Sequence, residues 1–374
     1  MKYFLVVGEA SGDLHASNLM RAILQQDSSA RFYFMGGPLM REVGGECVVR
    51  SEEMAYMGFI DVARNLSKIR AGAKKVQDKL LEVSPDVVIC VDYAGFCFRY
   101  ILPFVKRHLS QSKLVYYIPP KVWAWKKYRI KKLRTHTDLV LTIFPFEVDY
   151  FAKHNLPQAH YVGNPSMQSV EAYLQEPHEL ETLPKPYIAL LCGSRQSEIK
   201  QNLPTMLRVA GRYPSFGRVI AAAPGVPESL YHQVMEGAGI CATLVFNNTF
   251  SVVRSAQAAL VTSGTATLET ALLNTPQVVC YDVKAGSLAN FVFKKFFTIP
   301  FISLVNLVAG REIVQELFGG LFREELVQEA LAPLLHDTPE RQEMLEGYKE
   351  VRTLLHSEAE PATVAAEYII NAIN

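Results

Sequence analysis

The amino-acid sequence predicts an α/β protein built from two doubly wound parallel-sheet domains that face each other across a cleft. Short apolar runs rich in β-branched residues alternate with helix-length segments, which is typical of parallel sheets covered on both faces. A polar, proline-bearing stretch at 175–186 interrupts this alternation, which then restarts. With 374 residues, the chain also exceeds the size at which a single hydrophobic core keeps growing.

The elements follow in order along the chain. Apolar runs predict the strands of the first sheet at 3–7, 31–36, 86–92, 113–118, 138–144 and 160–164. Further runs predict the second sheet at 187–193, 217–224, 242–247, 258–264 and 277–282. We therefore expect a first domain over 1–175 plus a C-terminal helix at about 355–374, and a second domain over 185–345. In such sheets, ligands bind where the carboxyl ends of the strands meet the cleft.

The composition excludes several classes of protein. The formal net charge of +1 provides no global field, so we expect no nucleic-acid partner. The six cysteines are scattered without a CxxC pair, which predicts neither a disulfide framework nor a zinc site and fits a reduced, cytosolic protein. The N-terminus lacks the features of a signal peptide. The longest apolar-rich stretch, 296–310, is interrupted by polar residues and is shorter than the roughly 18 residues of a membrane span.

The first candidate loop, GEASGD at 8–13, lies between a predicted strand and a predicted helix. Its glycines permit a tight turn, and Ser11 or Asp13 is suited to cap the helix. The spacing GxxxG, with Glu9 inside it, differs from the GxGxxG of dinucleotide sites. Capping explains Asp13 well and Glu9 poorly. Because a carboxylate opposes phosphate binding at a helix start, Glu9 favours a sugar hydroxyl, with an ordinary glycine turn as the alternative.

The second candidate loop begins at Asp92, which ends the buried run at 86–92. A carboxylate at the carboxyl end of a parallel strand points into the cleft if the register allows it. There it is suited to act as a general base. Strand-end aspartates also cap the following helix, so capping remains the alternative.

The third candidate loop contains Gly193, Ser194 and Arg195 after the first strand of the second sheet, followed by Glu198 as in a capping box. Backbone N–H groups and a guanidinium fork suit a pyrophosphate. An arginine paired with a surface acid is the alternative.

The fourth candidate loop contains Ser263, Gly264 and Thr265 before a predicted helix, with Glu269 placed on its first turn. The hydroxyls and N–H groups suit a phosphate, and the acid suits a ribose diol, as in dinucleotide sites. Ordinary capping is again the alternative. Together the third and fourth loops predict a nucleotide pocket in the second domain.

Several unusual segments carry a family resemblance over nearly the whole chain. They are GEASGD (8–13), GGPLM (36–40), MAYMGFIDV (54–62), PPKVWAW (119–125), FPFE (144–147), GSRQSEI (193–199), SGTATLE (263–269) and NLVAGRE (306–312). In the same order, these segments resemble the lipid-A-disaccharide synthase family. The resemblance implies the glycosyltransferase-B fold, which consists of two Rossmann-like domains.

The resemblance also implies a reaction. An inverting transferase of this family joins UDP-2,3-diacylglucosamine to 2,3-diacylglucosamine 1-phosphate, and releases UDP and the β-1,6-linked lipid A disaccharide 1-phosphate. Asp92 is then the base that takes the proton of the acceptor's 6-hydroxyl, and Arg195 faces the UDP phosphates. No metal or other cofactor is expected. The other implied donor contacts are Gly193, Ser194, Ser263, Gly264, Thr265, Glu269 and Asn306. The implied acceptor contacts are Glu9, Ser11 and Asp13.

Three positions depart from the family pattern. Gly95 replaces a second acid, Asn164 replaces a histidine and Gln168 replaces an aspartate. A mechanism that needs two carboxylates or that histidine is therefore not expected here, and we expect a divergent but active enzyme, with a changed acceptor left open.

Two segments that mix aromatic and basic residues concern the lipid. Segment 290–301 suits a membrane interface, with a buried core helix or a dimer contact as equal alternatives. Segment 122–134 suits lipid phosphates or a solvated face. Met54, Tyr56, Met57 and Phe59 are candidates for an acyl-chain path or for the core. The resemblance implies a peripheral location on the inner face of the cytoplasmic membrane and is compatible with a homodimer.

Two other functions remain open from the residues. A UDP-sugar epimerase shares the two-domain architecture but needs no acceptor. A nucleotide-sugar binding protein without turnover is compatible with the missing second acid and histidine.

Overall fold

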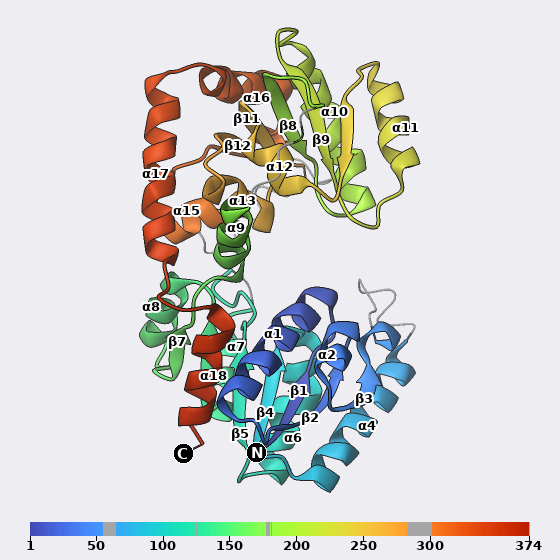
Figure 1. Cartoon of the computed structure of the whole chain (residues 1–374), viewed down its shortest axis with the longest axis vertical. Coiled ribbons are helices and arrows are strands. Elements are labelled where there is room, and N and C mark those ends of the chain that lie inside the picture. Colours follow the sequence, from blue (N-terminus) through green and yellow to red (C-terminus); the bar gives the residue numbers. More distant parts are fainter. Residues whose placement is uncertain (55–64, 125, 177–179, 181, 283–300, 374) are drawn as a thin grey trace. The chain divides into compact units, whose positions relative to one another are not determined.

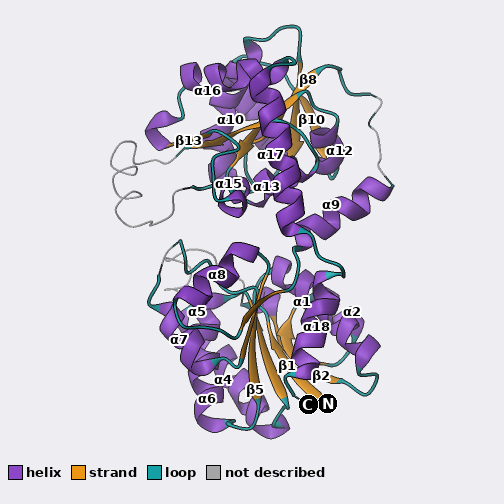
Figure 2. Ribbon diagram, turned by 90° about the vertical axis from the view of Figure 1, so that its left-hand side faces the viewer, coloured by secondary structure: helices purple, strands orange, loops and turns teal. Residues whose placement is uncertain are grey.

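The computed structural model describes residues 1–54, 65–124, 126–176, 180, 182–282 and 301–373. The chain divides into two compact units. The first unit comprises Met1–Pro165 and Ser357–Asn374, and the second comprises Ser166–His356. Each unit is a parallel sheet with helices on both faces (Figure 1, Figure 2).

Within the described residues, the sheet of the first unit has seven parallel strands in the order β3-β2-β1-β4-β5-β6-β7. The strands are β1 (Lys2–Val6), β2 (Arg31–Gly36), β3 (Glu46–Arg50), β4 (Val87–Val91), β5 (Lys113–Tyr117), β6 (Leu139–Thr142) and β7 (Ala159–Tyr161). The helices of this unit are α1 (Ala10–Gln26), α2 (Pro38–Val43), α4 (Leu66–Val83), α5 (Ala94–Phe96), α6 (Leu102–His108), α7 (Arg129–His136), α8 (Pro145–Lys153) and α18 (Pro361–Asn371), with short helical turns at Ser51–Glu53 and Cys97–Ile101.

The sheet of the second unit has six parallel strands among the described residues, in the order β10-β9-β8-β11-β12-β13. The strands are β8 (Tyr187–Leu191), β9 (Gly217–Ala222), β10 (Thr243–Phe246), β11 (Ala258–Thr262), β12 (Gln277–Tyr281) and β13 (Glu316–Phe318). The helices are α9 (Pro165–Gln175), α10 (Gln196–Gly211), α11 (Glu228–Ala238), α12 (Thr249–Arg254), α13 (Thr265–Leu272), α15 (Leu304–Ala309), α16 (Glu324–Leu331) and α17 (Pro339–Leu355), with short turns at Gly319–Leu321 and Ala332–Leu335.

This architecture confirms the predicted α/β fold class with two doubly wound parallel sheets. Each apolar run overlaps a strand, and both sheets follow the doubly wound order, which reverses once. The reversal lies between β1 and β4 in the first unit and between β8 and β11 in the second. Open α/β sheets bind ligands beyond the carboxyl ends of the strands at this reversal.

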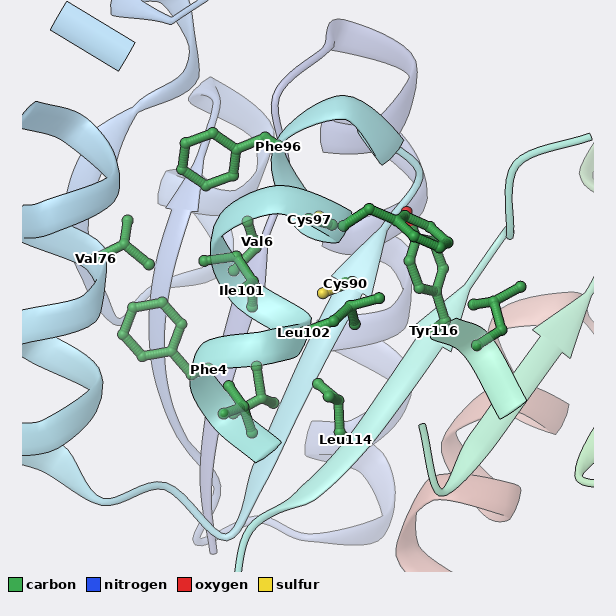
Figure 3. Close-up of a cluster of buried hydrophobic side chains, with 14 of the residues drawn as sticks. Phe4, Val6, Val76, Cys90, Phe96, Cys97, Ile101, Leu102, Leu114 and Tyr116 are labelled. Atoms are coloured by element: carbon green, nitrogen blue, oxygen red, sulfur yellow. The ribbon is translucent and has the colours of Figure 1, made fainter. Parts of the chain in front are cut away.

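The core of the first unit follows from the alternation of side chains along its strands. Phe4, Val6 and Cys90 point from β1 and β4 toward Ile101 and Leu102 on one face of the sheet (Figure 3). The intervening residues pack on the other face against α1 and α18, which lie side by side in both views (Figure 1, Figure 2). Those residues are Tyr3, Leu5, Val7, Ile89 and Val91. Strands buried on both faces account for the nearly continuous apolar runs.

Candidate functional site

The carboxyl ends of four neighbouring strands in the first unit carry a cluster of ionisable residues. Glu9 follows β1, Asp92 follows β4, Lys121 follows β5 and Glu147 follows β6. The reversal of strand order lies between the first two of these strands. The structure therefore brings Glu9 and Asp92 to the edge where ligands of such sheets bind.

The backbone holds Asp92 in a fixed and strained position. Its N–H donates to the Tyr117 carbonyl at 3.1 Å, and the Tyr116 hydroxyl donates to the Asp92 carbonyl at 2.6 Å. Asp92 and Tyr93 both have left-handed backbone conformations, with φ of 47° and 44°. For residues other than glycine, each such conformation costs about 1–2 kcal/mol, and such strain clusters at functional sites.

Gly8 allows the loop after β1 to approach the loop after β4. A Cβ atom at this position would lie 2.4 Å from the ring of Tyr93, so a larger residue would force the two loops apart. The glycine that precedes Glu9 thus serves a close contact with the segment that follows Asp92.

The surroundings of Asp92 make it a stronger base than an ordinary aspartate. Burial and, to a smaller extent, the nearby charge of Glu9 raise the pKa of Asp92 from 3.8 to about 6. A hydrogen bond from the Tyr93 backbone and the charge of Lys121 act in the opposite direction. At neutral pH the carboxylate is ionised and accepts a proton more readily, which suits a general base.

The other two residues of the GEASGD loop have different surroundings. Helix α1 begins at Ala10, so Ser11 and Asp13 lie inside it, and Ser11 is exposed. The Asp13 side chain is 2% exposed. Its carboxylate accepts backbone N–H groups of Gly37 (2.9 Å), Leu39 (2.9 Å) and Met40 (3.2 Å), so it caps α2. Glu9 and Ser11 are therefore the solvent-facing polar groups of this loop.

Sequence reasoning did not single out Lys121 or Glu147, although both lie in the quoted segments PPKVWAW and FPFE. The Lys121 side chain is exposed, yet the surrounding protein desolvates the ammonium and lowers its pKa. The charges of Glu147 and Asp92 raise this pKa in part. Lys121 is thus a cation within electrostatic range of the Asp92 carboxylate.

Glu147 is a buried acid with one unused oxygen. Its side chain is 2% exposed, and its Oε1 accepts the indole N–H of Trp123 at 2.8 Å. Its Oε2 has no hydrogen-bond partner among the described residues. Burial raises the pKa of Glu147 from 4.5 to about 7, against the opposing effects of the Trp123 hydrogen bond and the Lys121 charge. Trp123 therefore serves the interior and not a membrane-facing surface.

We expect Glu147→Gln to remove a pH dependence of stability. The raised pKa means that the native state keeps a proton that the unfolded state releases between pH 4.5 and about 7. Stability is therefore lost as the pH rises through this window, by about 3 kcal/mol for a shift of this size. Urea unfolding at pH 5 and pH 8 gives the free energy of unfolding of wild type and of the variant. The effect is the change with pH in the difference between these two free energies. A difference that does not change with pH would contradict the prediction.

The loop after β8 places the predicted phosphate-binding groups at the start of α10. Gly193 has a φ of 112°, a conformation that favours glycine. The carboxylate of Glu198 accepts the N–H groups of Ser194 (3.0 Å) and Arg195 (3.2 Å), as predicted for a capping box, and the Arg195 guanidinium at 3.0 Å. The Arg195 side chain is 69% exposed. Arg195 therefore remains accessible to a ligand while its backbone is fixed.

The loop after β11 lies beside the loop after β8 because the two strands are neighbours. Gly264 and Thr265 are exposed at the start of α13, and the Ser263 hydroxyl donates to the Ile302 carbonyl at 3.5 Å. Glu269 is half-buried one turn into α13 and not on its first turn, and burial raises its pKa. The structure thus brings the third and fourth predicted loops together.

Asn202, which sequence reasoning missed, fixes these two loops to each other. Its Nδ2 donates to Thr262 Oγ1 at 3.0 Å and to the Cys192 carbonyl at 3.4 Å. Its Oδ1 accepts the N–H of Asp282 at 3.0 Å. Because Asn202 is 1% exposed, these bonds hold the ends of β8, β11 and β12 in register.

The side chain of Asn306 makes all of its hydrogen bonds within the protein. Its Nδ2 donates to the Val314 carbonyl (2.8 Å) and to Glu316 Oε1 (2.9 Å), and its Oδ1 accepts the N–H groups of Ile313 (2.7 Å) and Val314 (3.0 Å). Glu316 also accepts the N–H groups of Ile302 and Ser303 at 2.8 Å. An amide side chain has two donors and two acceptor sites, so this one has none left for a ligand.

The three departures from the family pattern have different environments. A Cβ atom at Gly95 would meet nothing within 4 Å, so packing does not exclude a larger residue there. Asn164 is 3% exposed and donates to the Ile143 carbonyl at 2.9 Å. Gln168 is half-buried on α9.

Part of the predicted lipid-facing surface lies outside the described residues. This holds for Tyr56, Met57, Phe59, Trp125 and 290–300. Met54 is 3% exposed and belongs to the core, whereas Tyr128 beside the basic helix α7 is 69% exposed. Among the helices that the structure describes, none has the length and apolar character needed to cross a bilayer.

The chain is similar to a known family over almost its full length. A family model described as lipid-A-disaccharide synthetase matches residues 3–370. The lipid-A-disaccharide synthase of Myxococcus xanthus is 33% identical over 380 residues, with 100% of this chain and 97% of the relative covered. That of Idiomarina loihiensis is 34% identical over 371 residues, with 96% and 95% covered.

Solved structures with the same fold include enzymes of two kinds. The glycosyltransferase of kitacinnamycin has a TM-score of 0.65 at 13% identity, covering 100% of this chain and 99% of its own. UDP-GlcNAc 2-epimerase from Neisseria meningitidis, bound to UDP-GlcNAc, has a TM-score of 0.59 at 11% identity, covering 100% and 99%. At these identities the likeness concerns the fold alone.

Proposed function

The chain belongs to the lipid-A-disaccharide synthase family, and we propose that it joins UDP-2,3-diacylglucosamine to 2,3-diacylglucosamine 1-phosphate with Asp92 as the base. Its class of reaction is glycosyl transfer in lipid A biosynthesis. The whole-length family match favours this activity over the epimerase that shares the fold. The observation that best supports the assignment of the base is the strained, partly buried carboxylate at the strand-order reversal, whose pKa is raised to about 6.

In the proposed step, Asp92 accepts the proton of the acceptor's 6-hydroxyl as this oxygen attacks the anomeric carbon of the donor. The new C–O bond forms on the face opposite to UDP, and the bond to UDP breaks with its electron pair on the departing phosphate oxygen. Arg195, together with N–H groups of the loop after β11, offsets that charge. The configuration at the anomeric carbon is inverted.

Other residues take supporting roles in this proposal. Glu9 and Ser11 contact acceptor hydroxyls from the exposed start of α1. Gly193, Ser194, Ser263, Gly264 and Thr265 form the anion pocket. Glu269 holds the ribose. Because its side chain is fully bonded, Asn306 contributes by shaping the segment near the donor and not by direct contact.

An acceptor-dependence assay tests this function. The protein is incubated with UDP-diacylglucosamine in the presence and absence of the monosaccharide lipid phosphate, and both UDP and lipid products are measured. We expect UDP release and disaccharide formation only with the acceptor. UDP release or sugar isomerisation without acceptor would indicate that the protein is an epimerase. Thermal stabilisation by the ligand without any product would indicate a nucleotide-sugar binding protein.

We expect Arg195→Ala to weaken UDP binding by about 10- to 100-fold. This is the change in affinity that corresponds to the free energy of one charge-assisted hydrogen bond. Isothermal titration with UDP measures the effect. Lys200→Ala is the matched control, because Lys200 is an exposed cation in the first turns of α10, which Arg195 precedes. Unchanged UDP affinity in Arg195→Ala would show that the guanidinium does not contact the phosphates.

We further propose that the protein acts as a peripheral protein on the inner face of the cytoplasmic membrane, because both lipid substrates of the reaction reside in a bilayer. The basic helix α7 and the exposed Tyr128 support this location. A homodimer is also proposed, on the family resemblance alone. Flotation with anionic vesicles and sedimentation velocity test the two proposals.

A further inference from the structure

The loop after β5 brings a cation to the base of the proposed reaction, and the inference drawn from it rests on the proposed function. Ile118 has a left-handed backbone with φ of 56°, which is rare for a β-branched residue, and two prolines follow it. This turn directs the chain past the edge of the sheet to Lys121. Strand β5 is itself bonded to the base, because the Asp92 N–H donates to the Tyr117 carbonyl at 3.1 Å.

The Lys121 ammonium has unused bonding capacity. Its side chain is exposed, and within the described ranges it makes neither a hydrogen bond nor an ion pair. It nevertheless lies close enough to Asp92 and Glu147 for their charges to act on it, and for its charge to act on both of them. Three N–H donors are therefore available beside the base.

The proposed acceptor carries a phosphate, and a cation near Asp92 would stabilise its negative charge. In glucosamine 1-phosphate the phosphate-bearing carbon and the carbon that carries the 6-hydroxymethyl group both flank the ring oxygen. An acceptor whose 6-hydroxyl reaches Asp92 thus holds its phosphate in the same region. Asp92 and Glu9 are both carboxylates, and they repel a phosphate unless a positive charge offsets them.

From this arrangement we propose that Lys121 binds the phosphate of the acceptor and thereby selects phosphorylated over unphosphorylated glucosamine lipids. Within the part of the chain that the structure describes, Lys121 is a cation whose charge acts on both Asp92 and Glu147, and its exposed side chain is accessible to a ligand. It acts as a specificity residue, whereas Asp92 carries out the proton transfer.

The test compares two acceptors, 2,3-diacylglucosamine 1-phosphate and the same lipid without phosphate. For Lys121→Ala, we expect kcat/KM for the phosphorylated acceptor to fall by about 10- to 100-fold, the value of a charge-assisted hydrogen bond, with little change for the other acceptor. Lys121→Arg keeps the charge and is expected to retain most of the preference. Lys106→Ala removes an exposed cation from α6 of the same unit, outside the proposed site, and is expected to match wild type.

The outcomes separate this proposal from the proposed function. An equal loss with both acceptors, or a shift in the acid limb of the pH profile alone, would mean that Lys121 acts on Asp92 or on folding. Weaker UDP binding by Lys121→Ala would assign the ammonium to the donor. Either result overturns the phosphate role while leaving glycosyl transfer intact. If wild type forms no disaccharide from either acceptor, the proposed function itself fails.

Discussion

Asp92→Asn is expected to lower turnover by about 10²- to 10⁴-fold, the usual contribution of a general base. The amide has nearly the same shape as the carboxylate but does not accept the proton of the attacking hydroxyl. For wild type, kcat/KM should rise with pH through about 6, because only the ionised carboxylate acts and its pKa is raised to that value. Initial rates of disaccharide formation between pH 5 and 8 measure both effects.

Two controls separate chemistry from binding and folding. UDP affinity should be unchanged in Asp92→Asn, since the predicted UDP contacts lie in the second unit. Tyr93→Phe leaves the carboxylate in place and removes the hydroxyl that donates to the Met54 carbonyl at 3.2 Å, so it reports how far loop support alone affects the rate. Full activity of Asp92→Asn would contradict the assignment of the base.

Asp13→Ala is expected to destabilise the first unit by about 3 kcal/mol. The substitution leaves the N–H groups of Gly37, Leu39 and Met40 without their acceptor, and a buried donor without a partner costs about 1–3 kcal/mol. Both tryptophans of the sequence, at 123 and 125, fall within the first unit. Tryptophan fluorescence during urea unfolding therefore reports on this unit.

Ser11→Ala is the matched control for Asp13, because Ser11 is exposed on the same turn of α1. We expect its unfolding midpoint to equal that of wild type. Acceptor KM in Asp13→Ala, measured at a temperature where the variant is folded, distinguishes a structural acid from an acceptor ligand. A raised KM at unchanged stability would support the acceptor contact expected from the sequence.

The strands were predictable because burial on both faces requires long apolar runs. The two strands that the sequence did not indicate, β3 and β13, lie at the edges of their sheets. An edge strand has one neighbour and less of its surface buried, so ECVVR and the three residues of β13 carry a weaker signal. Loop positions followed from strand ends, which is why the loops after β1, β4, β8 and β11 were found.

The bonding partners of individual side chains were not predictable, because they depend on contacts between distant segments. Asp13 is bonded to residues 24 to 27 positions further along the chain. Asn306 is saturated by a loop that returns to it near β13. Likewise Lys121 comes within electrostatic range of both Asp92 and Glu147 only through the lateral order of β4, β5 and β6. Local sequence patterns do not contain that order.

The return of α18 to the first unit has a consequence for the order in which the protein is made. The second unit is a continuous stretch, Ser166–His356, and all of its residues leave the ribosome before α18 does. The first unit lacks the cover that Ala365, Ala366 and Ile369 provide over α1 until translation has passed the second unit and reached α18. The first unit is therefore the first to be translated but the last to complete its core. Until α18 is made, the apolar face that α18 covers stays exposed to solvent.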